Sequence, residues 1–151
     1  MTDIDFMRLA IVEAEKAAEL GEVPIGAVVV KDGAVIARGR NRVEEKHSVS
    51  AHAEFESIHE AEAILNDWRM SECTIYVTKE PCPMCAGMLI NSRVKRIVYG
   101  AEDPAGGFCG GAFDIKSRPG LLWHPEITGG VCGDESLELI RRFFRSRRAA
   151  K

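Results

Sequence analysis

The chain has 151 residues, a mass of 16.6 kDa and 46% hydrophobic residues, which is enough for one sizeable buried core but short for two domains. Its 20 Lys and Arg residues against 23 Asp and Glu residues give a formal net charge of -3, and this composition excludes a disordered or fibrous protein. The longest stretch without a charged residue, 81–92, has 12 residues and is too short to span a membrane. We therefore expect one globular domain over residues 1–151.

The first predicted element is a helix that begins after Thr2. Thr2 and Asp5 have the spacing of a capping box, and apolar residues recur at helical spacing from Phe6 until Gly21 ends the run. The acidic residues 1–5 lack the basic and apolar regions of an export sequence, so we expect a cytoplasmic protein.

A β-hairpin is predicted next. Residues 24–30 and 34–38 are short apolar runs rich in β-branched residues, and the Asp-Gly pair between them is typical of a tight hairpin turn. A polar loop leads to residues 51–65, which contain no Gly or Pro and are rich in Ala and Glu. This segment predicts a second helix.

Strands and helices alternate in the second half of the chain. In order, we expect a strand at 73–78, a helix at 82–90, a strand at 96–99, a short strand at 126–128 and a final helix at about 134–148. Pro81 suits the start of the helix at 82–90, and the stretch before 126 is rich in glycine. In the final helix we expect Leu137, Ile140 and Phe144 to face the core.

This order of elements predicts an α/β fold class. It fits a three-layer α/β/α sandwich, in which helices cover both faces of a central mixed sheet and helical crossovers join the later strands. No internal repeat or linker divides the chain.

The cysteines point to metal binding or buried thiols. There are five of them, at positions 73, 82, 85, 109 and 132. An odd number in a chain without an export sequence argues against a framework of disulfides.

Two short motifs could hold a metal ion. His52-Ala53-Glu54 stands at the start of the second predicted helix, and Cys82 and Cys85 stand three residues apart at the start of the third. Two cysteines at a helix start can direct both sulfur atoms to one point, where the helix amides favour thiolates. One His and two Cys leave the fourth position of a tetrahedral zinc ion open to water, and Glu54 could then carry a proton instead of binding the metal.

Simpler roles remain open for these residues. His52 could cap the helix or lie in the core, and Glu54 could merely stabilise the first helical turn through the helix dipole. A Cys-x-x-Cys pair also occurs in redox sites and in structural zinc sites. A fourth protein ligand would make the site structural, and the candidates are Cys73, Cys109, Cys132, His47, His59 and His124.

Together the motifs resemble the zinc-dependent nucleoside and nucleobase deaminases, whose signature is His-x-Glu followed by Pro-Cys-x-x-Cys. Further strings resemble the bacterial tRNA-specific adenosine deaminases, and this resemblance covers nearly the whole chain. The matching strings are residues 21–27, 51–54, 67–69, 76–78, 80–87, 91–93, 98–100 and 143–145.

The resemblance implies a cytidine-deaminase-like fold, a homodimer, and hydrolysis of adenosine to inosine at the wobble position of a tRNA anticodon. The implied partner is the anticodon stem-loop of a tRNA. The resemblance assigns His52, Cys82 and Cys85 to one Zn2+ per chain, Glu54 to proton transfer, and Asn41, the backbone of Ala53 and Asp103 to substrate binding. Of these, Asp103 matches a family residue that lies near the nucleotide before the target.

The chain departs from the family pattern in three places. Residues 48–50 read Ser-Val-Ser where Asp-Pro-Thr is usual, Ala105 stands where Lys is frequent, and residues 122–124 read Leu-Trp-His where Asn-His-Arg is usual. Two of these changes remove groups that could contact nucleic acid, so the alternative is a deaminase of a free nucleobase or nucleoside of the guanine or cytosine type. A binding module with a structural zinc is a third hypothesis, and Glu54 argues against it.

Positive charge is concentrated at the C-terminus. Residues 141–151 hold six cations and no acid, whereas the first 140 residues hold 14 cations and 23 acids. On a helix, Arg141, Arg142, Arg145 and Arg148 would form one cationic stripe that could contact a tRNA backbone. The alternative is an ordinary solvated helix face.

Overall fold

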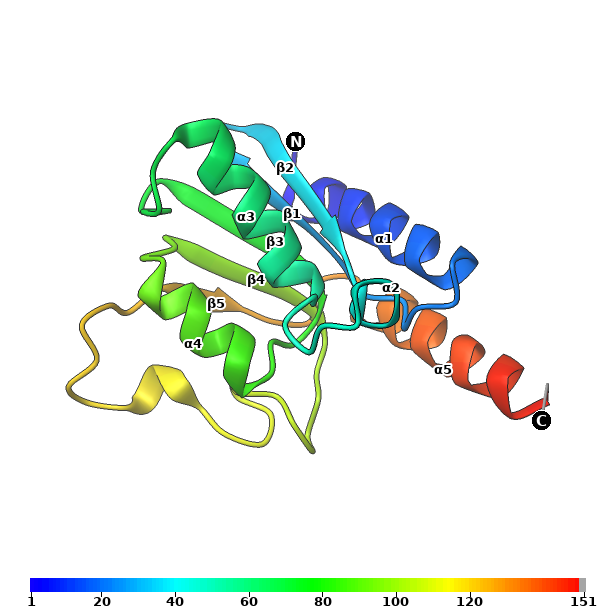
Figure 1. The fold of residues 1–151 in the computed structure, drawn as a ribbon. Coiled ribbons are helices and arrows are strands. Elements are labelled where there is room, and N and C mark those ends of the chain that lie inside the picture. Colours follow the sequence, from blue (N-terminus) through cyan, green and yellow to red (C-terminus); the bar gives the residue numbers. More distant parts are fainter. Residues whose placement is uncertain (150–151) are drawn as a thin grey trace.

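Five strands form one mixed sheet between two layers of helices (Figure 1). The computed structural model describes residues 1–149. Its helices are α1 (Asp3–Glu19), α2 (Val43–Lys46), α3 (Ala53–Leu65), α4 (Pro83–Asn91) and α5 (Gly133–Ala149), and its strands are β1 (Gly26–Lys31), β2 (Ala34–Arg40), β3 (Cys73–Lys79), β4 (Arg96–Ala101) and β5 (Glu126–Thr128). The predicted three-layer α/β/α sandwich is confirmed.

The strands lie in the order β2-β1-β3-β4-β5. Strand β1 pairs antiparallel with β2 and β3, whereas β4 pairs parallel with β3 and β5. Because successive side chains of a strand point to opposite faces, each central strand contributes to two separate cores. Val29 and Ile75 belong to one core, and their neighbours Val28 and Tyr76 belong to the other.

Helices α3 and α4 cover one face of the sheet, and α1 and α5 cover the other (Figure 1). The first core includes Ile58 of α3 and Leu89 of α4. The second core includes Met7 and Ala10 of α1, and Leu139 of α5 packs against it. Within the described residues, no helix is both long and apolar enough to span a membrane.

The predicted helices and strands are present, with small shifts at their ends. The structure adds the single turn α2 inside the loop expected between β2 and α3, and a 3-10 turn at Ile115–Ser117. The expectation that helical crossovers join the later strands is confirmed for β3 and β4, which α4 connects, whereas a segment without a long helix connects β4 to β5. The segment between β4 and β5 is rich in Gly and Pro, which disfavour a long helix.

The prediction that Phe144 faces the core is wrong, because its side chain is 43% exposed. Ser136 is buried and Leu139 packs on the second core, and Phe143 continues this face of α5 four residues further on. A rotation of about 100° per helical residue separates the two neighbouring phenylalanines. The sequence pattern alone could not decide which of them packs inward.

Candidate active site

The starts of α3 and α4 bring one imidazole and two thiols together. His52 immediately precedes α3, Cys82 immediately precedes α4, and Cys85 lies in the first turn of α4. The His52 Nδ1 atom lies 3.8 Å from Cys82 Sγ and 3.4 Å from Cys85 Sγ, and the donor atoms all lie within 4.8 Å of one another. Across residues 1–149, no fourth His, Cys, Asp or Glu side chain joins this cluster.

The spacing of these donor atoms fits a tetrahedral zinc ion. Zn–N bonds of about 2.0–2.1 Å and Zn–S bonds of about 2.3 Å place a ligand nitrogen and a ligand sulfur about 3.6 Å apart at tetrahedral angles. The observed distances of 3.4 and 3.8 Å bracket this value. Hydrogen bonding with the Cys85 thiol lowers the pKa of the Cys82 thiol to about 4, so this sulfur is disposed to be a thiolate. Three such donors leave one position for a ligand from outside the chain.

Glu54 is buried beside the cluster without being part of it. Its side chain lies in the first turn of α3 and is 4% exposed. Burial disfavours the charged form and raises the pKa of this carboxyl above its ordinary value. The group is therefore suited to holding a proton, which a solvent-exposed carboxylate would release.

Most residues singled out from the sequence surround one small cavity of about 70 Å³. Its lining includes His52, Cys82, Glu54, Asn41, Ala53 and Asp103. These residues come from the ends of β2 and β4 and from the starts of α3 and α4. Separate parts of the chain thus supply the metal-competent cluster, the buried carboxylate and the polar walls of a single cavity.

Asn41 is held in place at the end of β2. Its amide Nδ2 donates to the Val23 carbonyl at 3.3 Å, and its Oδ1 accepts from the Val43 N–H at 3.2 Å. An amide side chain has two N–H groups and two lone pairs. One of each is therefore free to face the cavity that Asn41 lines.

Asp103 lies in the loop after β4 and faces a cation. Its Oδ1 accepts from the N–H groups of Ala105 and Gly106, each at 3.1 Å, and its Oδ2 lies 3.3 Å from Lys79 Nζ. Burial opposes ionisation, but the Gly106 N–H and the Lys79 ammonium outweigh it and lower the pKa of the Asp103 carboxyl. Asp103 is therefore a fixed negative charge at the cavity.

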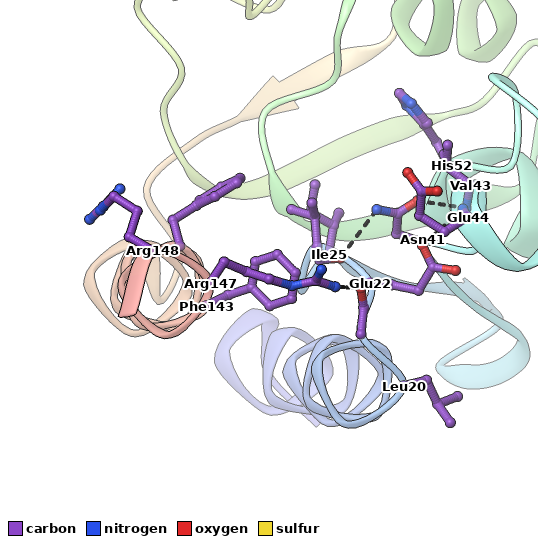
Figure 2. A pocket seen from close by; sticks show the side chains of 13 residues that line it. Leu20, Glu22, Ile25, Asn41, Val43, Glu44, His52, Phe143, Arg147 and Arg148 are labelled. Carbon is purple, nitrogen blue, oxygen red and sulfur yellow. Dashed lines mark hydrogen bonds between the residues drawn. The ribbon is translucent and has the colours of Figure 1, made fainter. Parts of the chain in front are cut away.

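A much larger groove, of about 880 Å³, meets the small cavity (Figure 2). Ile25, Asn41 and His52 line both spaces. Figure 2 shows the side chains of Phe143 and Arg147 on the opposite side of the groove, on α5. The small cavity thus adjoins a groove of much larger volume, which extends to α5.

The four arginines expected to form a stripe lie around α5 in different surroundings. Arg148 lines the groove, whereas Arg141 and Arg142 line separate hollows on either side of the helix. The Nη2 atom of Arg145 lies 2.7 Å from the exposed Glu138 Oε1. The sequence reading did not select Arg147, which lies over the Phe143 ring at 4.9 Å and donates to the Gly21 carbonyl.

Two buried carboxylates near the cavity were also missed. Glu80, 3% exposed, lines the cavity and binds the loop after β4. Glu22, also 3% exposed, accepts from the N–H groups of Glu44 and Glu45 at 3.0 and 2.8 Å and so fixes the turn α2. Both residues occur within strings that resemble the family, at 21–27 and 80–87, and this was the signal in the sequence that could have identified them. Neither residue belongs to the zinc signature.

Comparison with known proteins gives a consistent family. The MafB19-like deaminase family matches residues 1–129. A tRNA-specific adenosine deaminase of Agrobacterium fabrum is 46% identical over 143 residues, which is 95% of this chain and 94% of the relative. A protein of the same description from Bacillus subtilis is 44% identical over 146 residues, covering 97% of this chain and 91% of the relative.

Solved structures agree with this similarity. A chain from a study of A-to-I editing by tRNA:A34 deaminases at the wobble position of transfer RNA has a TM-score of 0.86 and 44% identity, over 89% of this chain and 98% of that one. Guanine deaminase from Bacillus subtilis has a TM-score of 0.65 and 38% identity, over 68% of this chain and 66% of that one. The predicted cytidine-deaminase-like fold is confirmed, and the chain belongs to the tRNA-specific adenosine deaminases, within the MafB19-like deaminase family.

Proposed function

We propose that the protein hydrolyses adenosine to inosine and ammonia at the wobble position of a tRNA anticodon. One observation carries the proposal. The cavity that holds Glu54 and the His52 imidazole opens into a groove whose far wall is the cationic end of α5. A base that is turned out of an anticodon loop could enter the cavity while the rest of the loop lies along the groove.

The donor set supports one zinc ion per chain, held by His52, Cys82 and Cys85. When bound, zinc supplies Lewis-acid activation of a water molecule for attack on C6 of adenine. Glu54 accepts a proton from the attacking water on a carboxylate oxygen. It then donates this proton to the exocyclic nitrogen, which leaves as ammonia while C6 retains the oxygen.

The proposed base contacts use atoms that are still unpaired at the cavity wall. Asn41 has one amide N–H and one carbonyl lone pair left after its two bonds to the backbone. The backbone of Ala53 lies between His52 and Glu54 at the same wall. Asp103 also lines the cavity, and its proposed role is to contact the nucleotide that precedes the target.

The competing substrate is a free nucleobase or nucleoside, because guanine deaminase has a similar fold. A small substrate would need the cavity alone and gives no use for a groove of about 880 Å³ that is lined by Arg147 and Arg148. We expect inosine in total tRNA, and little product from adenosine, cytidine or guanine tested side by side with the same enzyme. Efficient turnover of guanine or cytidine, with none of tRNA, would contradict the proposal.

The chain is also proposed to act as a homodimer. Trp68 is 47% exposed and borders an apolar hollow of about 220 Å³ between α3 and α4, to which Phe55 and Met88 contribute. Exposed aromatic surface of this kind is frequent in subunit interfaces. Light scattering should give twice the chain mass, and a monomer at micromolar concentration would contradict this part of the proposal.

A further inference from the structure

Glu80 is a buried carboxylate that the proposed chemistry does not use. It follows the last residue of β3, and its side chain is 3% exposed. Its Oε1 accepts from the Asp103 N–H at 3.0 Å, and its Oε2 accepts from the N–H groups of Cys109 and Gly111 at 2.9 and 2.8 Å. Three backbone donors thus converge on one charge, which offsets the cost of burying it.

The loop after β4 is shaped to surround this carboxylate. A Cβ atom on Gly107 would overlap the Glu80 carboxylate, and a Cβ atom on Gly111 would lie 2.5 Å from Glu80 Oε1. Only glycine allows the backbone to approach so closely at these two positions. Gly107 and Gly111 therefore have a specific use, which is to let the loop close around Glu80.

The same loop forms one wall of the cavity. The Asp103 carboxylate contacts the Lys79 ammonium, and the Asp103 backbone N–H donates to Glu80. On the other side of Glu80, the Phe108 N–H donates to the Pro81 carbonyl at 2.9 Å, next to Cys82. The first part of the loop, residues 103–111, is thereby held against residues 80–81, which lead from β3 to the metal-competent cluster.

We propose that Glu80 is a positioning residue, which acts through the backbone of Asp103 to set the wall of the cavity and so the binding of substrate. This inference rests on the proposed function only in its choice of substrate. It assigns Glu80 no contact with the reacting atoms. Its effect should therefore be on KM, because the hydrogen bonds of its carboxylate go to the loop after β4 and not to Glu54 or the metal-competent cluster.

The variant Glu80→Gln separates these roles by its hydrogen-bonding pattern. The amide oxygen of Gln can replace Oε2 and accept from the N–H groups of Cys109 and Gly111. The NH2 group then faces the Asp103 N–H, and because both groups are donors, no hydrogen bond can form between them. The loss of a charged hydrogen bond at this point should raise KM on the order of tenfold. We expect kcat and zinc content close to those of the parent. Glu102→Gln, which removes an exposed charge from the same segment, is the matched control and should keep the parent KM.

A double-mutant cycle tests whether Glu80 acts through Asp103. In an Asp103→Ala background, Glu80→Gln should raise KM no further. The Asp103 carboxylate, which Glu80 positions by holding the backbone of the same residue, is already absent there. The proposal would be overturned if the effects of the two substitutions on KM multiply in the double variant. It would also be overturned if Glu80→Gln alone keeps the KM of the parent, or lowers kcat instead of raising KM. If Glu80→Gln does not fold, Gly107→Ala disturbs the contact between the loop and Glu80 from the loop side. This variant should also raise KM. A Gly107→Ala enzyme with the KM of the parent would overturn the proposal.

All rates are measured on the substrate that the parent deaminates. A failure of the tRNA assignment therefore shows in the parent enzyme, whereas a failure of the positioning role shows only in the variants. Hydrogen exchange gives a readout that needs no turnover, since the Asp103 amide, which loses its acceptor in Glu80→Gln, should exchange faster, whereas the Cys109 and Gly111 amides keep an oxygen acceptor and should change less. Unchanged exchange at the Asp103 amide would also count against the proposal.

Discussion

Helices α3 and α4 both begin at residues that give them no side-chain cap. The positions before their first residues are occupied by His52 and Cys82, and neither side chain accepts a hydrogen bond from the helix amides. A Ser, Thr, Asp or Asn at such a position stabilises a helix by about 1 kcal/mol. The chain gives up this stabilisation at two places, and what it gains is a pair of metal-competent donors at the ends of two neighbouring helices.

Glu54 is the residue whose removal should affect chemistry alone. Glu54→Gln keeps the size of the side chain but cannot carry the proton, so we expect turnover to fall by the ~10²- to 10⁴-fold typical of a general acid–base group. Zinc content should stay at the parent value, because Glu54 lies outside the three-donor cluster. Inosine formation and elemental analysis check the two expectations. Glu60→Gln, on the exposed side of α3, is the control and should change neither.

A loss of zinc in Glu54→Gln would contradict this division of roles. The residue would then have to be a ligand, or a support for one.

At the scale of elements, the site depends on how closely α3 lies against β2. A Cβ atom on Gly39 of β2 would be 2.5 Å from the Ala53 carbonyl oxygen and 2.5 Å from the Ser57 backbone nitrogen. Contacts this short are with backbone atoms, which cannot swing away as a side chain can. Gly39 therefore sets the depth at which the start of α3 packs, and with it the position of His52 and Glu54.

Gly39→Ala should push the start of α3 away from the sheet. We expect a loss of stability of about 1–3 kcal/mol, as for other overpacked core positions, together with weaker zinc retention, because His52 moves relative to the two cysteines. Thermal unfolding and zinc content after dialysis against a chelator give the two measurements. The control is Gly87→Ala in α4, where a Cβ atom would meet nothing within 4 Å.

Gly87→Ala should be neutral or stabilising by up to about 1 kcal/mol, since Ala favours a helix over Gly. Parent-like stability and zinc retention in Gly39→Ala would show that the α3 start is not held by this contact.

At the scale of the whole molecule, charge is divided between an acidic body and a basic end. The groove reflects this division, because Glu22 and Glu44 of the body line it together with Arg147 and Arg148 of α5. The last turns of α5 also project beyond the sheet (Figure 1). A polyanion that reaches the cavity would therefore meet the cations of α5 at the far wall of the groove.

Neutralising Arg141, Arg142, Arg145 and Arg148 together to Gln should weaken tRNA binding and flatten its dependence on salt. Each phosphate contact contributes a slope of about 0.7 to 0.9 in a plot of log affinity against log salt concentration. Turnover of bound substrate should change little, because the cavity is built from other elements. Affinity measured at several salt concentrations checks the expectation.

The control for this variant neutralises four cations that do not line the groove, Arg8, Lys31, Arg38 and Lys95, and should leave the slope nearly unchanged. Equal slopes for the parent and the α5 variant would show that these four arginines do not contact the phosphate backbone, and the remaining groove-lining cation of α5, Arg147, would then be neutralised in the same way.

The sequence by itself determined the helices and strands and predicted the donor set that the structure brings together. Capping, apolar spacing and the Asp-Gly turn are local properties, so they predicted α1 and the β1–β2 hairpin from neighbouring residues alone. The zinc-site motifs are also local, since each stands at one helix start. Their spacing along the chain and the longer resemblance were enough to give the family.

Only the tertiary structure decided what depends on distant contacts. Whether Phe143 or Phe144 packs inward depends on how α5 rotates against the sheet, which no repeat in its own sequence specifies. The role of Glu80 depends on three amides more than 20 residues away, and that of Gly39 on the depth of α3. Such roles arise from close packing between segments that are remote in sequence, and a local pattern carries no information about a neighbour that only folding brings near.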